Sequence, residues 1–199
     1  MKKFWLTSTL LCLAVFAWAQ LDNSLYDFNE NRLRKQKTAM TVLGTWAVGN
    51  IAVGASLMGN RKGSDKYFHQ MNLGWGAINL ALAGFGYYSA VNTDPGSFGL
   101  YETMNQQHRF QKILLFNAGL DVGYMLGGAY LIERAKTTPD SKNPERLKGF
   151  GQSIILQGAF LFVFDLATYL VLAKDNENLQ PLLGNLTFTG DSIGLVWQF

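Results

Sequence analysis

The sequence predicts an all-α membrane protein, a four-transmembrane-helix bundle followed by a short C-terminal β-hairpin. Three observations predict this class. Only 16% of the 199 residues are charged, against roughly a quarter in ordinary soluble domains. Apolar stretches recur along the chain, and each is close to the ~20 residues that a helix needs to cross a bilayer. The N-terminus has the charged, apolar and small-residue order of an export signal.

Residues 1–19 are predicted to be a secretory signal peptide. Lys2 and Lys3 precede an apolar run, and Ala17 and Ala19 supply the small residues of a cleavage site. The only cysteine, Cys12, lies in this leader. The mature chain would therefore have no thiol for a disulfide, a thiolate metal site or a nucleophile.

Four predicted spans form a bundle over residues 38–174, and only Asp121 and Asp165 place a charge in their interiors. Each span has the length and apolar character of a membrane-crossing helix. The spans cover residues 38–60, 67–91, 112–132 and 150–173.

The export signal places the start of the mature chain outside the cytoplasm. With four spans, both termini are expected in the periplasm, and the protein is expected in the bacterial inner (cytoplasmic) membrane. Residues 20–37 place Leu21, Leu25 and Phe28 on one helical face ahead of a basic cluster, which predicts an interfacial helix leading into the first span.

The second pair of spans resembles the first, which predicts two tandem two-helix repeats. Sliding one pair along the other superimposes small, aromatic and amide residues at matching positions. The matches are Val48 with Val122, Gly49 with Gly123, Gly54 with Gly128, Ala55 with Ala129, Phe68 with Phe150, Gln70 with Gln152, Gly76 with Gly158, Ala77 with Ala159 and Tyr87 with Tyr169.

Each span has one stripe of small or polar residues at three- and four-residue steps, and these stripes are expected to face one another. Span one contributes Asn50 and Gly54. The other stripes are Asn72, Gly76, Asn79, Ala83 and Gly86 in span two, Asn117, Asp121, Tyr124 and Gly128 in span three, and Ile154, Gly158, Leu161, Asp165 and Thr168 in span four.

Asp121 and Asp165 are the leading candidates for a binding or transport site. Both are predicted about 12 to 14 Å below the outer surface at 1.5 Å per residue, so they could meet at one level. A carboxylate at that depth is costly unless it faces the interior, and a close pair would hold one proton between them. The alternative is that each acid is satisfied locally, Asp121 by Asn117 and Tyr124, and Asp165 by Thr168 or Tyr169.

Asn50, Asn79 and Gln157 are further intramembrane polar candidates. They could line a cavity, but bonding helix to helix is the favoured interpretation. Span three also has Gly119, Gly123 and Gly127 at four-residue intervals, a seam that permits close approach of helices. Packing inside the bundle is favoured for this seam over a homo-oligomer contact.

The tail, residues 175–199, alternates apolar and other residues across Gly190-Asp191, the period-two pattern of a β-hairpin. Such a hairpin could cover the outer mouth of the bundle or offer an edge to a protein partner. The closing aromatic Phe199 is also typical of outer-membrane barrel strands, which makes the outer membrane an alternative location.

Several function classes find no support in the sequence. It contains no phosphate loop, dinucleotide fingerprint, paired-histidine zinc motif or paired-cysteine motif, so no cofactor or metal is expected. His69 and His108 are predicted at opposite membrane faces, too far apart to share a metal. A mature chain that is almost neutral lacks the basic patch that nucleic-acid binding requires.

The export signal, the LYDFNENRLRKQK entry, four glycine-rich spans and the short aromatic tail resemble a family of small bacterial membrane proteins of unknown function. The resemblance covers nearly the whole mature chain. It implies a fold but no activity, and it assigns no role to any residue.

The sequence therefore predicts a non-enzymatic membrane bundle that scaffolds a protein partner or binds a small ligand or lipid in its outer half. The alternative is a proton- or ion-linked transporter that uses Asp121 and Asp165 and acts as an oligomer. An enzyme acting on lipid is the weakest candidate, because no nucleophile or metal accompanies the two acids.

Overall fold

The computed structural model describes residues 2–139, 143–179, 186–189 and 192–195, with side chains described within 22–139 and 144–179. This part of the chain contains four long α-helices: α1 (Lys2–Met58), α2 (Gly63–Asn92), α3 (Leu100–Thr137) and α4 (Asn143–Ala173). A single 3-10 turn, η1 (Pro95–Ser97), precedes α3. The protein is therefore helical, as the sequence predicts.

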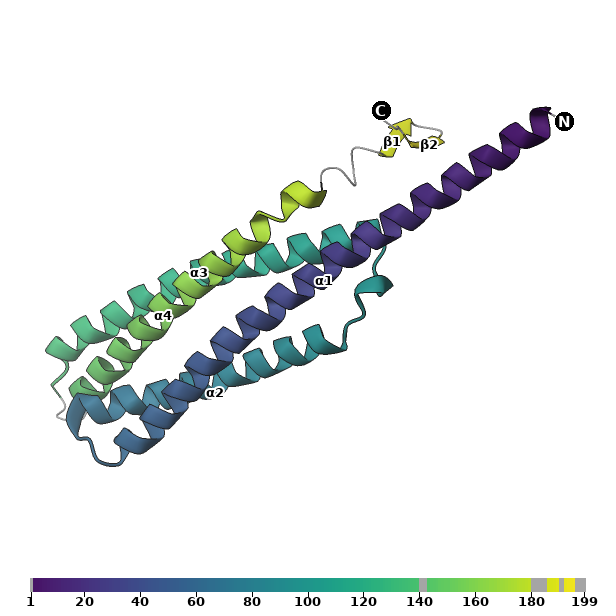
Figure 1. Ribbon diagram of the computed structural model, residues 1–199. Coiled ribbons are helices and arrows are strands. Elements are labelled where there is room, and N and C mark those ends of the chain that lie inside the picture. The colour runs from purple at the N-terminus through teal and green to yellow at the C-terminus, as the bar shows by residue number, and fades with distance from the viewer. Residues whose placement is uncertain (1, 140–142, 180–185, 190–191, 196–199) are drawn as a thin grey trace.

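The first helix is longer than the predicted first span. Its 57 residues run without a break from the N-terminal segment into the bundle (Figure 1). The first proline of the chain is Pro95, so nothing in residues 2–58 removes a backbone donor or kinks the helix. The predicted interfacial helix (20–37) and most of the first predicted span (38–60) consequently belong to one continuous helix.

The helices pair as two hairpins, α1 with α2 and α3 with α4, and α2 packs against α4 to join the hairpins (Figure 1). Gly63, with a φ of +62°, permits the tight turn between α1 and α2. Between α2 and α3, the carboxylate of Asp94 accepts a hydrogen bond from the backbone N–H of Gly96 at 3.0 Å and fixes η1.

Glycines set the approach of the helices within each hairpin. A Cβ atom on Gly54 would lie 2.9 Å from the carbonyl oxygen of His69, and one on Gly128 would lie 2.6 Å from that of Gly151. These distances leave no room for a side chain. The helix backbones therefore touch, as they do at small-residue helix contacts in membranes.

The opposite helix of each hairpin has an equivalent contact. A Cβ atom on Gly76 would lie 3.0 Å from the carbonyl oxygen of Ala47, and one on Gly158 would lie 2.9 Å from that of Asp121. All four glycines belong to the stripes predicted to face one another, and that part of the prediction is confirmed.

The predicted internal packing of Gly119, Gly123 and Gly127 is wrong. All three are exposed on α3, and a Cβ atom on any of them would meet no atom within 4 Å. Four-residue spacing places residues on one helical face, but it does not say which face turns inward. On α3 the inward face is instead the one that contains Asp121 and Gly128, both buried.

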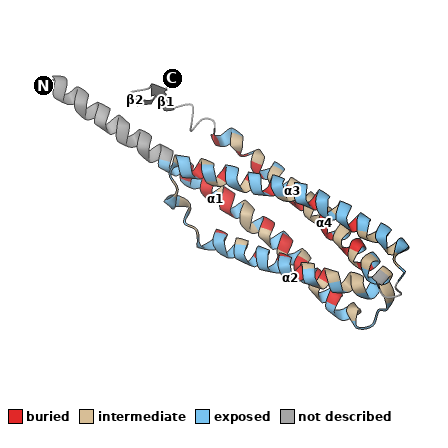
Figure 2. Ribbon diagram, turned by 180° about the vertical axis from the view of Figure 1, so that it is seen from behind, coloured by how far each residue is buried: buried red, intermediate tan, exposed pale blue. Residues whose placement is uncertain are grey.

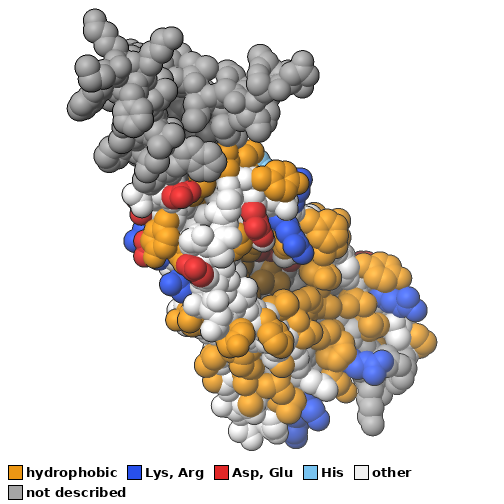
Figure 3. All heavy atoms as spheres, turned by 90° about the vertical axis from the view of Figure 1, so that its right-hand side faces the viewer, with side chains coloured by type: hydrophobic (Ala, Val, Ile, Leu, Met, Phe, Trp, Pro, Cys, Tyr) orange, Lys and Arg blue, Asp and Glu red, His pale blue; other side chains and the backbone are white. Residues whose placement is uncertain are grey.

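Buried positions are spread along all four helices (Figure 2), and they include many polar side chains, while many large apolar side chains are exposed. Amide side chains such as Asn79, Gln107 and Gln157 are fully buried, whereas Phe85 is 77% exposed and Leu126 67% exposed. In the space-filling view, hydrophobic side chains cover the middle of the visible face and most charged ones lie toward its ends (Figure 3).

Two helical segments are long and apolar enough to cross a membrane, Asp22–Met58 and Pro144–Leu179. The sequence predicts four spans. Within the described residues, α2 and α3 are less apolar than these two segments and do not meet the same test of length and apolar character. Glycine, asparagine, tyrosine and tryptophan make up much of α2, and α3 has a polar run over residues 105–109 near its start. These residues lower the apolar character of both helices.

The tail contains a two-stranded antiparallel sheet. Strand β1 (Leu186–Thr189) pairs with β2 (Ser192–Leu195), and Phe188 lies opposite Ile193. The predicted turn at Gly190-Asp191 lies outside the described residues. A role for this hairpin in binding a partner remains a prediction.

Candidate functional site

The polar interior is organised around Gln157 on α4. Its Nε2 donates to the side-chain oxygens of Asn50 on α1 at 2.7 Å and Asn72 on α2 at 2.9 Å. Its Oε1 accepts from the indole N–H of Trp46 at 2.9 Å. The hydroxyl of Ser153 also donates to Asn72, at 2.7 Å. We call these five residues the amide cluster.

The amide cluster ties three helices together and leaves little capacity for a ligand. Gln157 uses both its donor group and its oxygen on protein partners, and Asn50 donates to the carbonyl oxygen of Trp46 at 2.8 Å. The ring of Trp46 stacks on Phe160 at 3.9 Å between centroids. The favoured sequence interpretation, that Gln157 bonds helix to helix, is confirmed.

The two interior acids meet, as the depth argument predicts. Asp121 on α3 is 2% exposed and Asp165 on α4 is 5% exposed, and the two side chains lie close enough to interact with each other. One oxygen of Asp121, Oδ2, has no partner. Thr168 donates to the carbonyl oxygen of Phe164 instead of Asp165, so local satisfaction by Thr168 is wrong.

The remaining predicted polar residues are dispersed. Asn79 is 1% exposed, and its amide nitrogen has no partner among the described residues. Tyr124 is 38% exposed and packs edge-on against Trp75 at 5.2 Å between ring centroids. Asn117 is half-buried. These three residues form no common site with the acids in the described contacts.

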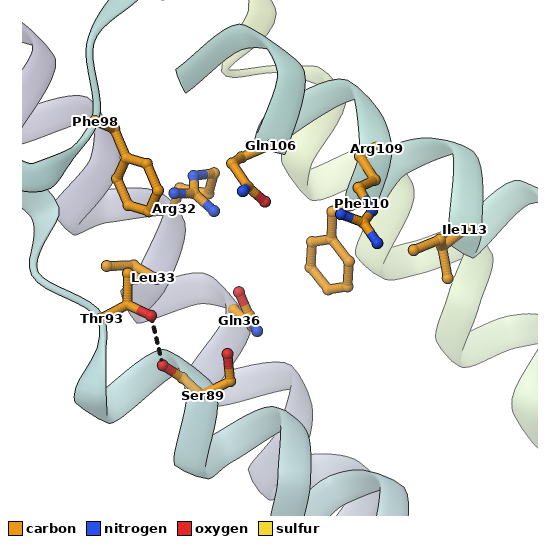
Figure 4. A pocket seen from close by; sticks show the side chains of 10 residues that line it. All are labelled: Arg32, Leu33, Gln36, Ser89, Thr93, Phe98, Gln106, Arg109, Phe110 and Ile113. Atoms are coloured by element: carbon orange, nitrogen blue, oxygen red, sulfur yellow. Dashed lines mark hydrogen bonds between the residues drawn. The ribbon is translucent and has the colours of Figure 1, made fainter. Parts of the chain in front are cut away.

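Two pockets lie in the half of the bundle that contains the connection between α2 and α3, and neither is lined by a predicted site residue. The first, of about 290 Å³, lies among α1, the end of α2 and the start of α3 (Figure 4). Its wall includes Arg32, Gln36, Phe98, Gln106 and Arg109. We call it the arginine pocket.

The second pocket is a groove of about 510 Å³ between α1 and α4. These two helices make few contacts with each other, which leaves the groove open between the hairpins. Its wall is largely apolar and includes Val42, Phe160 and Val163, but Arg34 and Lys35 border one end of it. We call it the α1–α4 groove.

Polar contacts fix the helices around both pockets. Lys35 forms an ion pair with both carboxylate oxygens of Asp175 at 2.6 Å, which joins α1 to the turn after α4. Gln107 on α3 is fully buried and donates to the carbonyl oxygen of Leu172 at 2.8 Å. The walls of the two pockets are thus fixed by several polar contacts.

The described residues provide no group of three or more histidine, cysteine, aspartate or glutamate side chains able to hold a metal ion.

Residues 42–166 match the model of a family described as a family of unknown function, DUF6992. This match covers more than half of the chain. The chain belongs to the DUF6992 family. No curated protein and no solved structure matches it. The predicted resemblance to an uncharacterised family is confirmed.

The DUF6992 match begins within α1 and ends within α4, so it takes in the amide cluster and both interior acids. Arg32, Arg34 and Lys35 precede it. The family region therefore includes the packed centre of the bundle, whereas the cationic residues of α1 that border the two pockets lie outside it.

Sequence reasoning missed both pockets. One basic run contains Arg32, Arg34 and Lys35, and such a run is typical of a helix end that is exposed to solvent. Arg32 is buried by residues more than 60 positions later in the chain, such as Phe98 and Thr103. The sequence around Arg32 therefore does not predict its burial.

Proposed function

We propose that this protein is a non-enzymatic integral membrane bundle that binds an anionic lipid in the α1–α4 groove. The observation that carries this proposal is the composition of the groove: a long apolar wall with cations at one end. A lipid has the same division between an alkyl chain and a charged headgroup.

Membrane insertion is supported by the exposure of large apolar side chains. Large apolar side chains such as Ile78, Leu82 and Phe116 are more than half exposed, and water would penalise each of them at about 25 cal/mol per Å². Contiguous exposed apolar surface on a monomer marks a membrane or partner contact. We propose that all four helices cross the bilayer, with α2 and α3 as hairpin partners of the two most apolar helices.

The length of the groove fits an alkyl chain lying along the helices. Its lining residues extend from 31 to 42 on α1 and from 160 to 172 on α4, about 16 to 18 Å of helix at 1.5 Å per residue. Most of the wall consists of valine, phenylalanine, leucine and alanine side chains. Such a surface offers dispersion contacts to an alkyl chain, and the hydroxyls of Thr38 and Thr168 on it donate to carbonyl oxygens of their own helices.

The cations at one end of the groove fit an anionic headgroup. Arg34 is exposed, and within the described residues its guanidinium contacts no carboxylate, only the side-chain oxygen of Asn31 at 2.8 Å. Lys35 is paired with Asp175 but borders the same end of the groove. Because the proposed first span starts at residue 38, Arg34 lies where lipid headgroups would be.

Native mass spectrometry of the full chain, released from vesicles containing phosphatidylglycerol and phosphatidylcholine, tests this proposal. Wild type should retain phosphatidylglycerol in preference to phosphatidylcholine. Ala167→Trp should fill the exposed groove wall and abolish retention, and Arg34→Gln should remove the preference for the anionic lipid.

The matched control is Ala129→Trp, which places the same side chain at an exposed alanine of α3 that lines neither pocket. It should retain lipid as wild type does. Equal retention by Ala167→Trp and Ala129→Trp would refute the groove as the binding site.

Proton- or ion-linked transport by an oligomer is a second candidate, favoured by the contact between Asp121 and Asp165. Two buried carboxyl groups in contact hold a shared proton, the arrangement that a proton relay requires. Vesicles containing the protein and a pH-sensitive dye would report proton flux. Asp121→Asn should abolish that flux without loss of folding. If vesicles with the wild-type protein show no more flux than empty vesicles, this candidate is eliminated.

A further inference from the structure

Arg32 is a buried cation without a counter-ion. Its side chain is 4% exposed, and no carboxylate of the described residues lies within 4 Å of it. Its Nη2 donates to the side-chain oxygen of Asn29 at 3.2 Å, but Nε has no partner. Burying an unpaired charge costs several kcal/mol, so such an arginine requires an explanation.

The surrounding residues hold the guanidinium in place. Asn29 is fully buried and donates to the hydroxyl of Thr103 on α3 at 2.8 Å and to the carbonyl oxygen of Leu25 at 2.9 Å. The ring of Phe98 lies under the guanidinium at 5.2 Å. Contacts of this kind orient a cation, but they do not neutralise it.

Arg32 lines the arginine pocket together with a second cation (Figure 4). Arg109 on α3 is exposed and, within the described residues, forms no ion pair. The side chain of Gln106 lies between the two arginines in the close-up, and Gln36 lies on the opposite wall. Amide and guanidinium groups from two helices thus border one cavity, and no acidic residue lines it.

We infer that the arginine pocket binds an oxyanion, the phosphate or carboxylate group of a small molecule or of a lipid headgroup, with Arg32 as the buried ligand and Arg109 at the mouth. A guanidinium presents paired N–H donors that match the oxygens of both groups. The bound anion would supply the counter-charge and the acceptor that Arg32 lacks. A volume of about 290 Å³ suits a small ligand or a headgroup.

This site is separate from the α1–α4 groove. None of the residues that line the arginine pocket lines the groove, and the arginine pocket is bordered by α2 and α3 instead of α4. The inference therefore does not depend on lipid binding in the groove.

The test uses the full chain in an uncharged detergent, with its unfolding temperature measured at constant ionic strength. Sodium phosphate, sodium acetate and a short-chain phosphatidic acid are the probes, and sodium chloride is the reference. We expect at least one oxyanion to raise the unfolding temperature above the chloride value. Stabilisation by phosphate or acetate identifies a soluble oxyanion, and stabilisation by phosphatidic acid alone identifies a headgroup.

Variants assign the effect to the pocket. Arg32→Gln should abolish the response to the oxyanion. Arg109→Gln, at an exposed position that does not threaten folding, should weaken apparent affinity roughly tenfold or more, the value of one hydrogen bond to a charged group. Arg134→Gln is the matched control on the same helix, because it lines neither pocket, and it should respond as wild type does.

Two results would overturn the inference. The first is an unfolding temperature of wild type that no oxyanion raises above the chloride value. The second is an unchanged affinity in Arg109→Gln relative to Arg134→Gln. Ala167→Trp should leave the oxyanion response intact, so failure of the lipid proposal and failure of this inference give different results.

Discussion

The two helical hairpins share their packing but differ in the chemistry that they enclose. Gly54 and Gly128 approach the neighbouring backbone at matching positions, and so do Gly76 and Gly158. At the positions that match Asp121 and Asp165 in α3 and α4, the first hairpin has alanines, Ala47 and Ala83, and both are buried. Equivalent backbones therefore surround a charged centre in one hairpin and an apolar one in the other.

The contacts between the two hairpins also use different chemistry at matching positions. Gln157 on α4 donates to Asn50 on α1, and the matching positions, Trp75 on α2 and Tyr124 on α3, form an aromatic pair. The bundle thus has an amide side and an aromatic side around one glycine framework. The glycines fix the approach of the backbones in both hairpins, while the side chains on that framework differ. Substitutions at matched positions separate these two contributions.

The largest effect is expected at Gly128. A Cβ atom there would lie 2.6 Å from a backbone oxygen, so Gly128→Leu should lower the free energy of unfolding by about 3 kcal/mol or more. Gly127→Leu is the adjacent control, since a Cβ atom there meets nothing within 4 Å, and its effect should stay within about 0.5 kcal/mol. Denaturant unfolding in detergent measures both; equal losses would show that close backbone approach does not set the fold.

A smaller loss is expected when the amide side is broken. Gln157→Leu removes the partner of Trp46, Asn50 and Asn72 at once, and stranded buried polar groups cost about 1–3 kcal/mol. Gln152→Leu makes the same change at an exposed position of α4 and should be almost neutral. The same unfolding assay applies, and a Gln157→Leu variant as stable as Gln152→Leu would show that the amide cluster contributes little.

Replacing one acid of the Asp121–Asp165 pair by an amide should lower the free energy of unfolding by less than the loss of the amide cluster does. In Asp165→Asn the side chain still reaches Asp121 and can donate to it, so the loss should be about 0.5–1.5 kcal/mol. Asp165→Leu, which leaves Asp121 buried and alone, should cost more. Thermal unfolding of the two variants side by side checks this order, and the reverse order would mean that the contact between the acids does not stabilise the bundle.

The smallest effect is expected for the ion pair of Lys35 and Asp175. Because Lys35 is partly exposed, Lys35→Gln should cost about 0.2–1 kcal/mol, and less at high salt. Lys37→Gln, a neighbour without an ion pair among the described residues, is the control. Unfolding midpoints at low and high salt measure the difference; a loss that does not depend on salt would contradict the electrostatic origin.

Periodicity explains which parts of the structure the sequence predicts. Three- and four-residue steps place Gly76, Asn79 and Ala83 on one face of α2, and all three are buried. The same reasoning, with depth counted from the span ends, brings Asp121 and Asp165 together. Both predictions depend only on helical geometry along a single segment.

Predictions that required knowledge of neighbouring helices were less successful. The spacing of Gly119, Gly123 and Gly127 defines a face, but the side of α3 that turns inward depends on where α4 lies. The two pockets arise from gaps between hairpins, so no single segment encodes them. Burial of Arg32 likewise depends on Asn29 being fixed by Thr103, a contact across 74 positions of the chain.

Photo-crosslinking with a bifunctional anionic lipid tests the central claim, lipid binding between α1 and α4, most directly. The full chain would be irradiated in vesicles, and modified peptides mapped by mass spectrometry. We expect crosslinks to concentrate in residues 31–42 and 160–172, which form the two walls of the groove, and to disappear from both in Ala167→Trp. Crosslinks spread evenly over the exposed faces of α2 and α3 would contradict a specific lipid site.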